Sequence, residues 1–243
     1  MAAPREITIE SLNGHWVLNK DLTSEADPIL KLVRKISPST NTKLIIIYLP
    51  QQKVPWLIRK AFGLATIYIQ ITQYQTQTSE TSQPSTNIDF NQTATAGLAA
   101  TKEERVLDWK ISGHEDYFFG KVQAQSEFVH GVIDADGIIR PGFELQTENA
   151  NAEIKKYLRG EIEVDGRKSE GFIVEDWSGM SEQGPGLWVH TFERNVQSGW
   201  TAEQIWGFEM YGDSRYFSRR GVVMTTKGQY ICGRIVFDFI DSE

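Results

Sequence analysis

The sequence predicts an all-β fold, an antiparallel β-barrel with a short helix-turn-helix lid near the N-terminus. Three observations predict it. Stretches in which apolar and polar residues alternate with a period of two recur from residue 65 to the C-terminus. Short turns containing glycine join the last of these stretches. Apolar residues at helical spacing are concentrated between residues 21 and 64.

The lid is expected to consist of two helices. Asp21–Lys35 carries apolar residues at helical spacing after candidate N-cap side chains. Pro55–Leu64 begins with proline, which suits the first turn of a helix. Residues 37–53 lie between the two helices, contain the apolar run Leu44–Leu49 and match neither periodicity. We predict that they are an insertion, which is an added β-strand at a barrel edge, a poorly packed excursion, or translated intron sequence from an incorrect gene model.

Strand signals follow directly. Ala65–Tyr74 alternates isoleucines with polar and aromatic residues, and a polar loop rich in Gln, Thr and Ser is expected at residues 76–87. Arg105–Ile111 and Phe118–Phe128 alternate again. A third short helix is expected at Ala152–Leu158.

The C-terminal third is predicted to be an antiparallel meander. Its strands are Leu187–Arg194, Ala202–Met210, Tyr216–Thr225 and Tyr230–Ile240, the last two joined by a turn containing Gly228. Such a meander avoids exposed strand edges most completely by closing into a barrel, although an open, highly curved sheet fits the same pattern. Since we find neither an internal repeat nor a linker, residues 1–243 are expected to form a single domain.

Composition excludes several classes of function. Twenty-five Lys and Arg against 32 Asp and Glu leave a net charge of −7 and a pI near 5.3, which argues against a nucleic-acid partner and against docking on an anionic membrane. The first ten residues lack the apolar core of a signal peptide, and the longest apolar run is far shorter than the ~20 residues of a membrane span. We therefore expect a cytoplasmic protein without membrane insertion; its oligomeric state stays open.

No sequence motif for a cofactor or a metal is present. The chain lacks a phosphate-binding glycine-rich loop, a dinucleotide fingerprint, a zinc-protease motif and a nucleophile elbow. Its single cysteine, Cys232, excludes an internal disulfide and is expected to be a small buried hydrophobic residue. The local cluster His114-Glu115-Asp116 is interpreted as a polar turn, not as a set of metal ligands. We expect no cofactor and no metal.

Both ends of the chain resemble the calycins, the superfamily of lipocalins and intracellular fatty-acid-binding proteins. Leu12–Leu18 (LNGHWVL) is similar to their Gly-x-Trp opening strand. Pro55–Ala65 (PWLIRKAFGLA) is similar to the second lid helix, which carries Arg-Lys and ends near a small residue. Ile231–Val236 (ICGRIV) is similar to the closing Cys-x-Arg-x-Tyr strand, but valine stands in place of the tyrosine. The stretches Trp56–Tyr74, Glu103–Phe128 and Trp200–Phe239 also resemble a group of fungal lipocalin-like proteins of unassigned function.

Candidate anchors for a ligand are polar groups isolated on apolar strand faces, because ligand cavities are mostly apolar with a few polar contacts. Arg105, Gln204 and His190 meet this criterion, although each also fits a structural role at a strand end or in the core. Tryptophans on these strands fit the core, the outer face or a pocket wall equally well. The candidate ligand-binding residues are Arg234, Arg105, Gln204, His190, Trp109 and Trp206.

Arg234 is nominated by the resemblance, which implies that it points into the barrel and holds an acidic head group. Strand alternation opposes this, because Ile235 and Phe237 occupy the opposite face and are better suited to the interior. Both statements hold if an additional segment covers the outer side of the strand, or if a bulge shifts its register.

Two functions fit these observations, and a third interpretation keeps the barrel packed full as a scaffold. The first is binding of a hydrophobic small molecule, such as a fatty acid, polyketide or terpenoid, inside the barrel. The alternative is a cofactor-independent isomerase or cyclase of natural-product biosynthesis that uses the same cavity to hold a reactive lipophile in one conformer. Catalytic residues cannot be assigned from the sequence.

The insertion generates a first prediction. Deleting residues 33–52 is expected to leave a folded protein, because the two helices can then be joined by a short turn. Urea unfolding monitored by tryptophan fluorescence measures this. Loss of a cooperative transition in the deletion variant would show that the segment belongs to the core.

Overall fold

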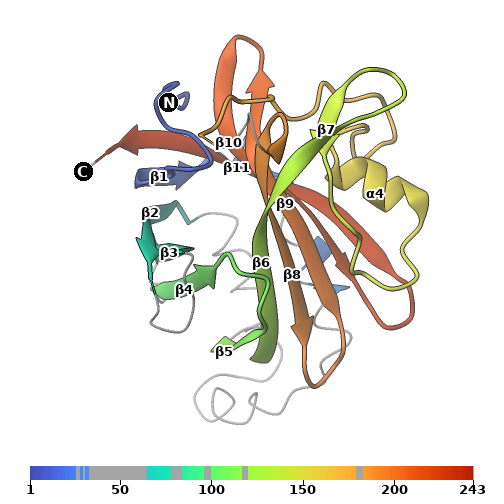
Figure 1. Cartoon of the computed structure of the whole chain (residues 1–243). Coiled ribbons are helices and arrows are strands. Elements are labelled where there is room, and N and C mark those ends of the chain that lie inside the picture. The colour runs from blue at the N-terminus through green and yellow to red at the C-terminus, as the bar shows by residue number, and fades with distance from the viewer. Residues whose placement is uncertain are drawn as a thin grey trace.

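The computed structural model describes residues 1–25, 28–29, 31–32, 65–77, 84–95, 100–116, 120–178 and 183–242. Antiparallel strands make up most of the regular structure in these ranges, and helix α4 accompanies them (Figure 1). The elements are β1 Gly14–Leu18, β2 Ile67–Thr76, β3 Ser85–Ala94, β4 Thr101–Val106, β5 Ser112–Asp116, β6 Gly120–Ile133, β7 Ile139–Pro141, α4 Ala152–Leu158, β8 Leu187–Asn195, β9 Thr201–Tyr211, β10 Ser214–Met224 and β11 Tyr230–Asp241.

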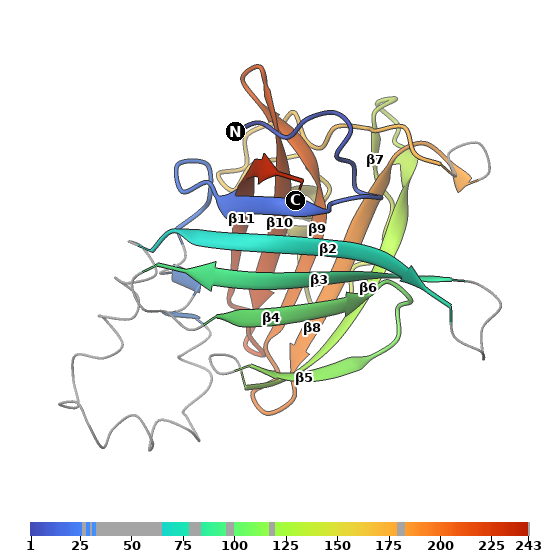
Figure 2. The same cartoon turned by 90° about the vertical axis from the view of Figure 1, so that its left-hand side faces the viewer.

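The strands form one curled, barrel-like sheet. Its order is β4-β3-β2-β1-β11-β10-β9-β8-β6-β5, and β7 pairs with β6. The curl brings β1–β4 across the face of β6, β8 and β9, so that the two halves form two layers (Figure 2). Between the halves, Leu107 pairs with Ser126 in an isolated parallel bridge, and the Trp109 amide donates to the Ser126 carbonyl at 2.9 Å. These contacts form a short seam, and the sheet is a half-barrel.

The inner core lies between the two layers. Trp16, from the Gly-x-Trp segment, is fully buried and packs on Phe217 and Phe239 at 5.5 and 5.0 Å between ring centroids. Its indole Nε1 donates to the Leu12 carbonyl. Other inward-facing members of this core are Ile69, Ile71, Ile88, Phe90, Val189, Trp206, Phe208 and Phe237.

A second core covers the outer face of β8–β11. Helix α4 and the flanking chain contribute Phe143, Ile154, Tyr157, Leu158 and Phe172. They pack against outward-facing residues of the sheet, Trp188, Ile205, Val222 and Met224. The Asn151 side chain caps α4 by accepting from the Ile154 amide. Because both faces of β8–β10 are covered along much of their length, polar side chains such as His190, Glu203 and Arg220 are buried.

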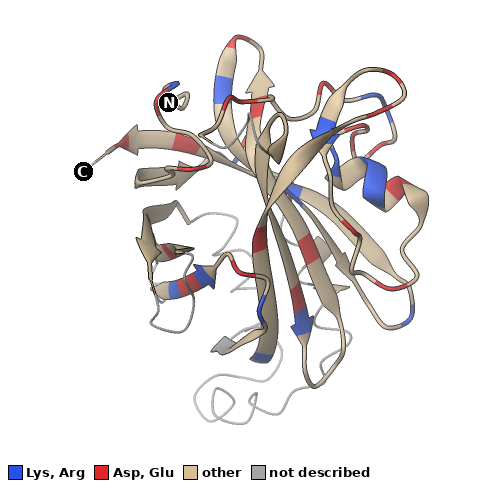
Figure 3. Cartoon of the chain, in the orientation of Figure 1, with Lys and Arg blue, Asp and Glu red and all other residues tan. Residues whose placement is uncertain are grey.

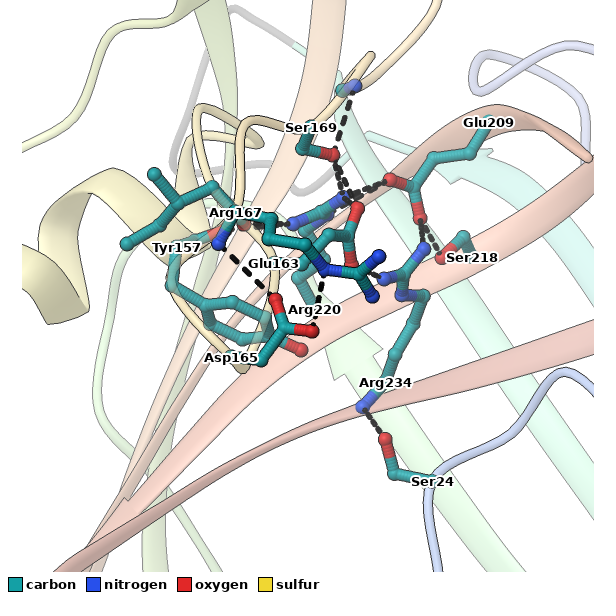
Figure 4. Close-up of polar contacts among 12 residues, drawn as sticks. Ser24, Tyr157, Glu163, Asp165, Arg167, Ser169, Glu209, Ser218, Arg220 and Arg234 are labelled. Carbon is teal, nitrogen blue, oxygen red and sulfur yellow. Dashed lines mark hydrogen bonds and ion pairs between the residues drawn. The ribbon is translucent and has the colours of Figure 1, made fainter.

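Charged side chains in the outer layer form a paired network (Figure 4). Arg220 is fully buried, and its Nε donates to Glu209 at 2.8 Å. The same guanidinium donates to the Ile162 carbonyl at 2.8 Å and to Ser169 Oγ at 2.7 Å. Buried charges are tolerated when they are paired and hydrogen-bonded, so this network attaches the segment after α4 to the sheet.

The predicted lid and insertion lie largely outside the described residues. Residues 28–29 and 31–32, within the first predicted helix, are helical. Residues 37–53 and the second predicted helix, Pro55–Leu64, are not among those described. Ahead of them, the Ser24 hydroxyl accepts from the Arg234 amide at 2.9 Å, which attaches this part of the chain to β11.

The predicted strands are present, with three differences. Both ends of the polar loop predicted at residues 76–87 belong to strands, because β2 extends to Thr76 and β3 begins at Ser85 and continues through Ile88 and Phe90, which point inward. Residues 78–83 lie outside the description. Residues 114–116, predicted as a turn, belong to β5 because they pair with β6. Strand β4 ends at Val106, before the predicted end at Ile111, because Trp109 adopts a left-handed backbone conformation. The short helix at Ala152–Leu158 is confirmed.

No helix in the described ranges has the combination of length and apolar character that crossing a membrane requires.

The outer network generates a second prediction. Arg220→Met should lower the free energy of unfolding by about 3–5 kcal/mol, because it leaves Glu209 buried without its main counterion. Urea unfolding at neutral pH measures the change. Arg167→Met is the matched control: Arg167 belongs to the same segment, but its pair with Asp165 is exposed, so the unfolding midpoint should not move. Equal effects of the two variants would contradict the assignment.

Candidate functional site

The inner face of β10 carries a buried arginine in an aromatic box. Arg219 is 6% exposed, and its Cζ lies 4.0 Å from the ring centroid of Trp206 and 4.3 Å from that of Phe90. Phe217 and Phe237 lie further out, at 5.5 and 5.4 Å. Register places Arg219 beside Trp206 on one side and beside Ile235 on the other. Cation–π contacts of this kind favour the charged form, but they provide no hydrogen-bond acceptor.

Arg219 has donors without acceptors. Among the described residues, its Nε and Nη2 have no hydrogen-bond partner. Burial lowers the pKa of Arg219 to about 10; Glu103 and Glu193 oppose this shift, and Arg105 adds to it. The side chain therefore still carries its positive charge at neutral pH. Unsatisfied buried donors are rare in folded proteins, and each one calls for an explanation.

Arg105 faces the same space from β4 and is paired. Its Nε donates to Glu103 at 2.6 Å, and its Nη2 donates to Glu193 on β8. Basic and acidic residues lie next to one another along β4 (Figure 3). Burial by itself lowers the pKa of Arg105, but the two carboxylates outweigh it and raise the pKa. The ion pair with Glu193 therefore connects the two layers of the half-barrel.

Further polar groups line the inner face one row away from Arg219. Ser126, Thr191 and Gln204 are direct cross-strand neighbours on β6, β8 and β9. Gln204 Oε1 accepts from the Trp206 indole at 3.0 Å. Five buried inward-facing atoms have no hydrogen-bond partner within the described ranges: Arg105 Nη1, Ser126 Oγ, Thr191 Oγ1, and Nε and Nη2 of Arg219.

A pocket of about 740 Å³ opens beside the seam. Leu107 and Phe128, which pack against the inner core, form part of its wall. Phe128 belongs to the same cross-strand row as Val189, Trp206 and Arg219, so the pocket borders the row that carries the unpaired guanidinium. The volume lies within the ~300–1,000 Å³ typical of small-molecule sites.

Trp109 stands at the rim of this pocket with φ of 57°. This left-handed conformation is uncommon for a bulky residue and costs of order 1–3 kcal/mol. Two hydrogen bonds fix this conformation: the Trp109 amide donates to the Ser126 carbonyl, and Gln125 Nε2 donates to the Trp109 carbonyl at 2.8 Å. The indole is thereby turned out of the interior and stacks on His190, with 4.8 Å between centroids.

His190 lies on the outer face of β8 between two carboxylates. Its Nε2 is 2.9 Å from Glu203 Oε1, and its Nδ1 is 3.4 Å from Glu127 Oε1. Glu203 is fully buried and accepts from the Thr147 amide and hydroxyl. Burial lowers the pKa of His190, but the hydrogen bonds to the two glutamates outweigh it and raise the pKa.

Arg234 also lies on the outer face, in the network around Arg220 (Figure 4). It donates to Glu163 and to the Tyr211 hydroxyl, and its Nη1 is 3.6 Å from Glu209. Arg234 therefore points away from the barrel interior, as the strand alternation predicted and contrary to what the resemblance implied, and Glu163 of the segment following α4 pairs with it. Its ligand-anchor role stays a prediction. Nearby, burial raises the pKa of the Cys232 thiol to about 12, which agrees with a small hydrophobic residue and not a nucleophile.

The structure thus divides the six predicted residues into two groups. Arg105, Gln204 and Trp206 lie together on the inner face. Arg234 and His190 lie on the outer face, and Trp109 stacks on His190 at the pocket rim. Arg219 was missed, although alternation in β10 places it with Phe217. Two consecutive arginines made that strand ambiguous, because one of them had to enter the core. In the described part of the chain, no group of three His, Cys, Asp or Glu side chains is placed to hold a metal ion.

Comparison with known proteins gives one informative match. The chain is 23% identical over 242 residues to a protein of Mollisia scopiformis named "Probable pericyclase scpY", covering 98% of this chain and 95% of that protein. No protein-family model matches the chain. No solved structure matches it.

His190 generates a third prediction, on pH dependence. A histidine whose pKa is higher in the folded state stabilises the fold below its unfolded pKa of ~6.5, and this stabilisation is lost as the pH rises through the folded pKa. Relative to that of His190→Gln, the urea midpoint of the parent should therefore fall as the pH rises above ~6.5. Parallel pH profiles for the two proteins would show that His190 does not titrate between the glutamates.

Proposed function

We propose that this protein binds a lipophilic small molecule between the two layers of its half-barrel and accelerates a cofactor-independent pericyclic reaction, a cyclisation or isomerisation, of that molecule. The observation that carries the proposal is Arg219, a buried cation with two unpaired donors in an aromatic box. An unpaired charge in a core is costly, so it is retained at the expense of stability where a function requires it.

The chemistry fits such a group. A pericyclic step moves electrons around a ring of bonding atoms and needs no net redox change and no external proton. A protein accelerates it by holding a flexible chain in the reactive conformer, and by donating hydrogen bonds to a carbonyl whose oxygen gains negative charge in the transition state. A charge-assisted hydrogen bond contributes ~1.5–3 kcal/mol, which corresponds to roughly a ten- to hundredfold rate effect.

Three further observations support the proposal. The similar protein from Mollisia scopiformis is named a probable pericyclase, and the similarity extends over nearly the full length of both chains. The pocket beside the seam is large enough for a folded lipophile. The buried Trp16 in the first strand is consistent with a calycin-like architecture, in which ligands occupy the barrel interior.

The second candidate function is binding without chemistry, for a fatty acid, polyketide or terpenoid. The aromatic inner core favours it, since burial of apolar ligand surface contributes ~25 cal/mol per Å² before the costs of association. In either function, Arg105, Gln204 and Trp206 contribute to the polar and aromatic wall around Arg219. The two candidates differ in whether the bound molecule reacts faster than in buffer.

The fourth prediction concerns catalysis of a model reaction. The test substrate is a linear trienone, in which an enone is tethered to a conjugated diene. The parent should accelerate its intramolecular cyclisation and change the ratio of diastereomeric products, measured by chiral chromatography. Arg219→Met should lose roughly ten- to hundredfold of that acceleration, since it keeps much of the volume but removes the donors. The same variant should unfold at an equal or higher urea concentration, because an unpaired buried cation has been removed.

Arg194→Met is the matched control, because Arg194 is an exposed arginine on β8 of the same sheet, and its rate and product ratio should equal those of the parent. Binding of the trienone with the rate and product ratio of buffer would favour the passive carrier. Marked destabilisation of Arg219→Met together with full activity would show that Arg219 is a structural support only.

A further inference from the structure

We propose that Glu127 is a general base that moves a proton between two carbons of an unsaturated ketone, at the junction of two pockets. The inference goes beyond the proposed function, because a proton shift is not a pericyclic step and uses a different group of side chains. Three features that meet at Glu127 carry it: a hydrogen-bonded row of titratable groups, a second pocket and a strained tryptophan.

The row consists of Glu127, His190 and Glu203, and its inner end is rigid. The Glu203 carboxylate is fully buried, lies 2.9 Å from His190 Nε2, and accepts from two backbone amides of the segment before α4. The His190 ring also contacts the rings of Trp109 and Phe143, each with 4.8 Å between centroids. Because these contacts restrict rotation of the imidazole, its Nδ1 stays directed at Glu127 Oε1, 3.4 Å away.

Glu127 is the exposed end of the row and lies where two pockets meet. Its side chain is 36% exposed, whereas those of His190 and Glu203 are buried. A second pocket, of about 550 Å³, adjoins the pocket at the seam, and its wall includes Val129 and Phe143 of the outer core. The residues that line both pockets are Trp109, Glu127, Phe128, His130 and Gln183. A molecule in either pocket can therefore contact Glu127.

The strain at Trp109 is located at the same point. Strained residues cluster at active sites, and here the left-handed backbone places the indole on His190. A structural ion pair inside the outer core requires only His190 and Glu203. A third, exposed carboxylate, held by that pair at a pocket, is the arrangement of a base with its orienting groups. Glu127 is thus the candidate catalytic residue, and His190 and Glu203 are positioning residues.

The proposed step is balanced without an oxidant or a cofactor. The Glu127 carboxylate removes a proton from the carbon between the carbonyl and the C=C bond of a β,γ-unsaturated ketone. The C–H bond breaks, an O–H bond forms on Glu127, and the electron pair moves onto the carbonyl oxygen, which gives a dienolate. Return of the proton to the γ-carbon moves the double bond into conjugation and restores the carboxylate.

The dienolate oxygen needs a hydrogen-bond donor, and His130 can supply one. Its imidazole lines both pockets and stacks on Trp177, with 4.8 Å between centroids. Burial lowers the pKa of His130 more than Glu127 raises it, so the ring is neutral at neutral pH and retains one N–H donor. The conjugated carbonyl compound that this step forms is the class of molecule that the proposed pericyclic step consumes.

Isomerisation of a long-chain β,γ-unsaturated methyl ketone in D2O tests the inference, because this compound has no diene and cannot cyclise. The parent should form the conjugated ketone faster than buffer does, measured by its absorbance, and should place deuterium on the γ-carbon, measured by NMR. Glu127→Gln should lose at least about a hundredfold of the acceleration. Glu148→Gln, at an exposed glutamate beside the segment that binds Glu203, should equal the parent.

Two further measurements separate catalysis from structural support. Added formate should restore part of the activity of Glu127→Ala, because it supplies a carboxylate in the space that the substitution leaves. His190→Gln and Glu203→Gln should lower kcat and leave KM for the ketone unchanged, as expected for positioning residues. Glu127 is partly exposed, so its variants should fold even if Glu203→Gln does not.

A parent rate equal to that of buffer would overturn the inference. Full activity of Glu127→Gln would also overturn it, because Glu127 would then serve only to hold His190. The same holds if activity is lost only through a higher KM, or if formate restores none of it. Glu127→Gln should cyclise the trienone as the parent does, since that reaction needs no proton transfer. Failure of either experiment therefore leaves the other proposal standing.

Discussion

Strand β10 sends two consecutive arginines to opposite faces of the sheet, and neither face is open to solvent. The desolvation of a cation therefore has to be compensated on each face, and the surrounding groups that compensate it differ between the two faces. On the outer face Arg220 is surrounded by carboxylates, carbonyls and hydroxyls. On the inner face Arg219 is surrounded by aromatic rings, and its Nε and Nη2 have no acceptor among the described residues. A fully paired arginine stabilises one arrangement of the chain, whereas an unpaired one leaves binding free energy available for a ligand.

The outer core supplies stability that allows the interior to contain polar groups without partners. Helix α4 and its flanking segments are held on β8–β11 by apolar packing and by the network around Arg220, so the sheet does not depend on a tightly filled interior for all of its stability. Marginal stability in most domains leaves room for few unsatisfied polar groups. Here the structure tolerates five buried inward-facing atoms without partners in the described ranges, because the second core lies elsewhere. A chain of this length is large enough to support both cores.

Much of the fold could be predicted from alternation alone. Strands β8–β11 alternate regularly, and their glycine turns fix a meander, because a period of two permits only one assignment of faces. The site was less predictable. Alternation placed Arg234 outside correctly. It also predicted a strand over Arg105–Ile111, because sequence patterns do not reveal that Trp109 is left-handed and turns its side chain to the other face. For Arg219, the sequence shows two adjacent arginines but not the segment that covers one of them.

The short seam between the layers has a mechanical consequence. Elsewhere neighbouring strands pair through ladders, but across the seam the backbone contacts among the described residues are one bridge at Leu107 and the hydrogen bond from the Trp109 amide. Substitution of a few side chains at the seam can therefore change the distance between the two layers, and the hydrogen bonds of the strand ladders stay intact. Successive substitutions along this seam can widen or narrow the interior in small steps. For evolution, this makes the size of the accepted molecule an adjustable trait, separable from the stability of the scaffold.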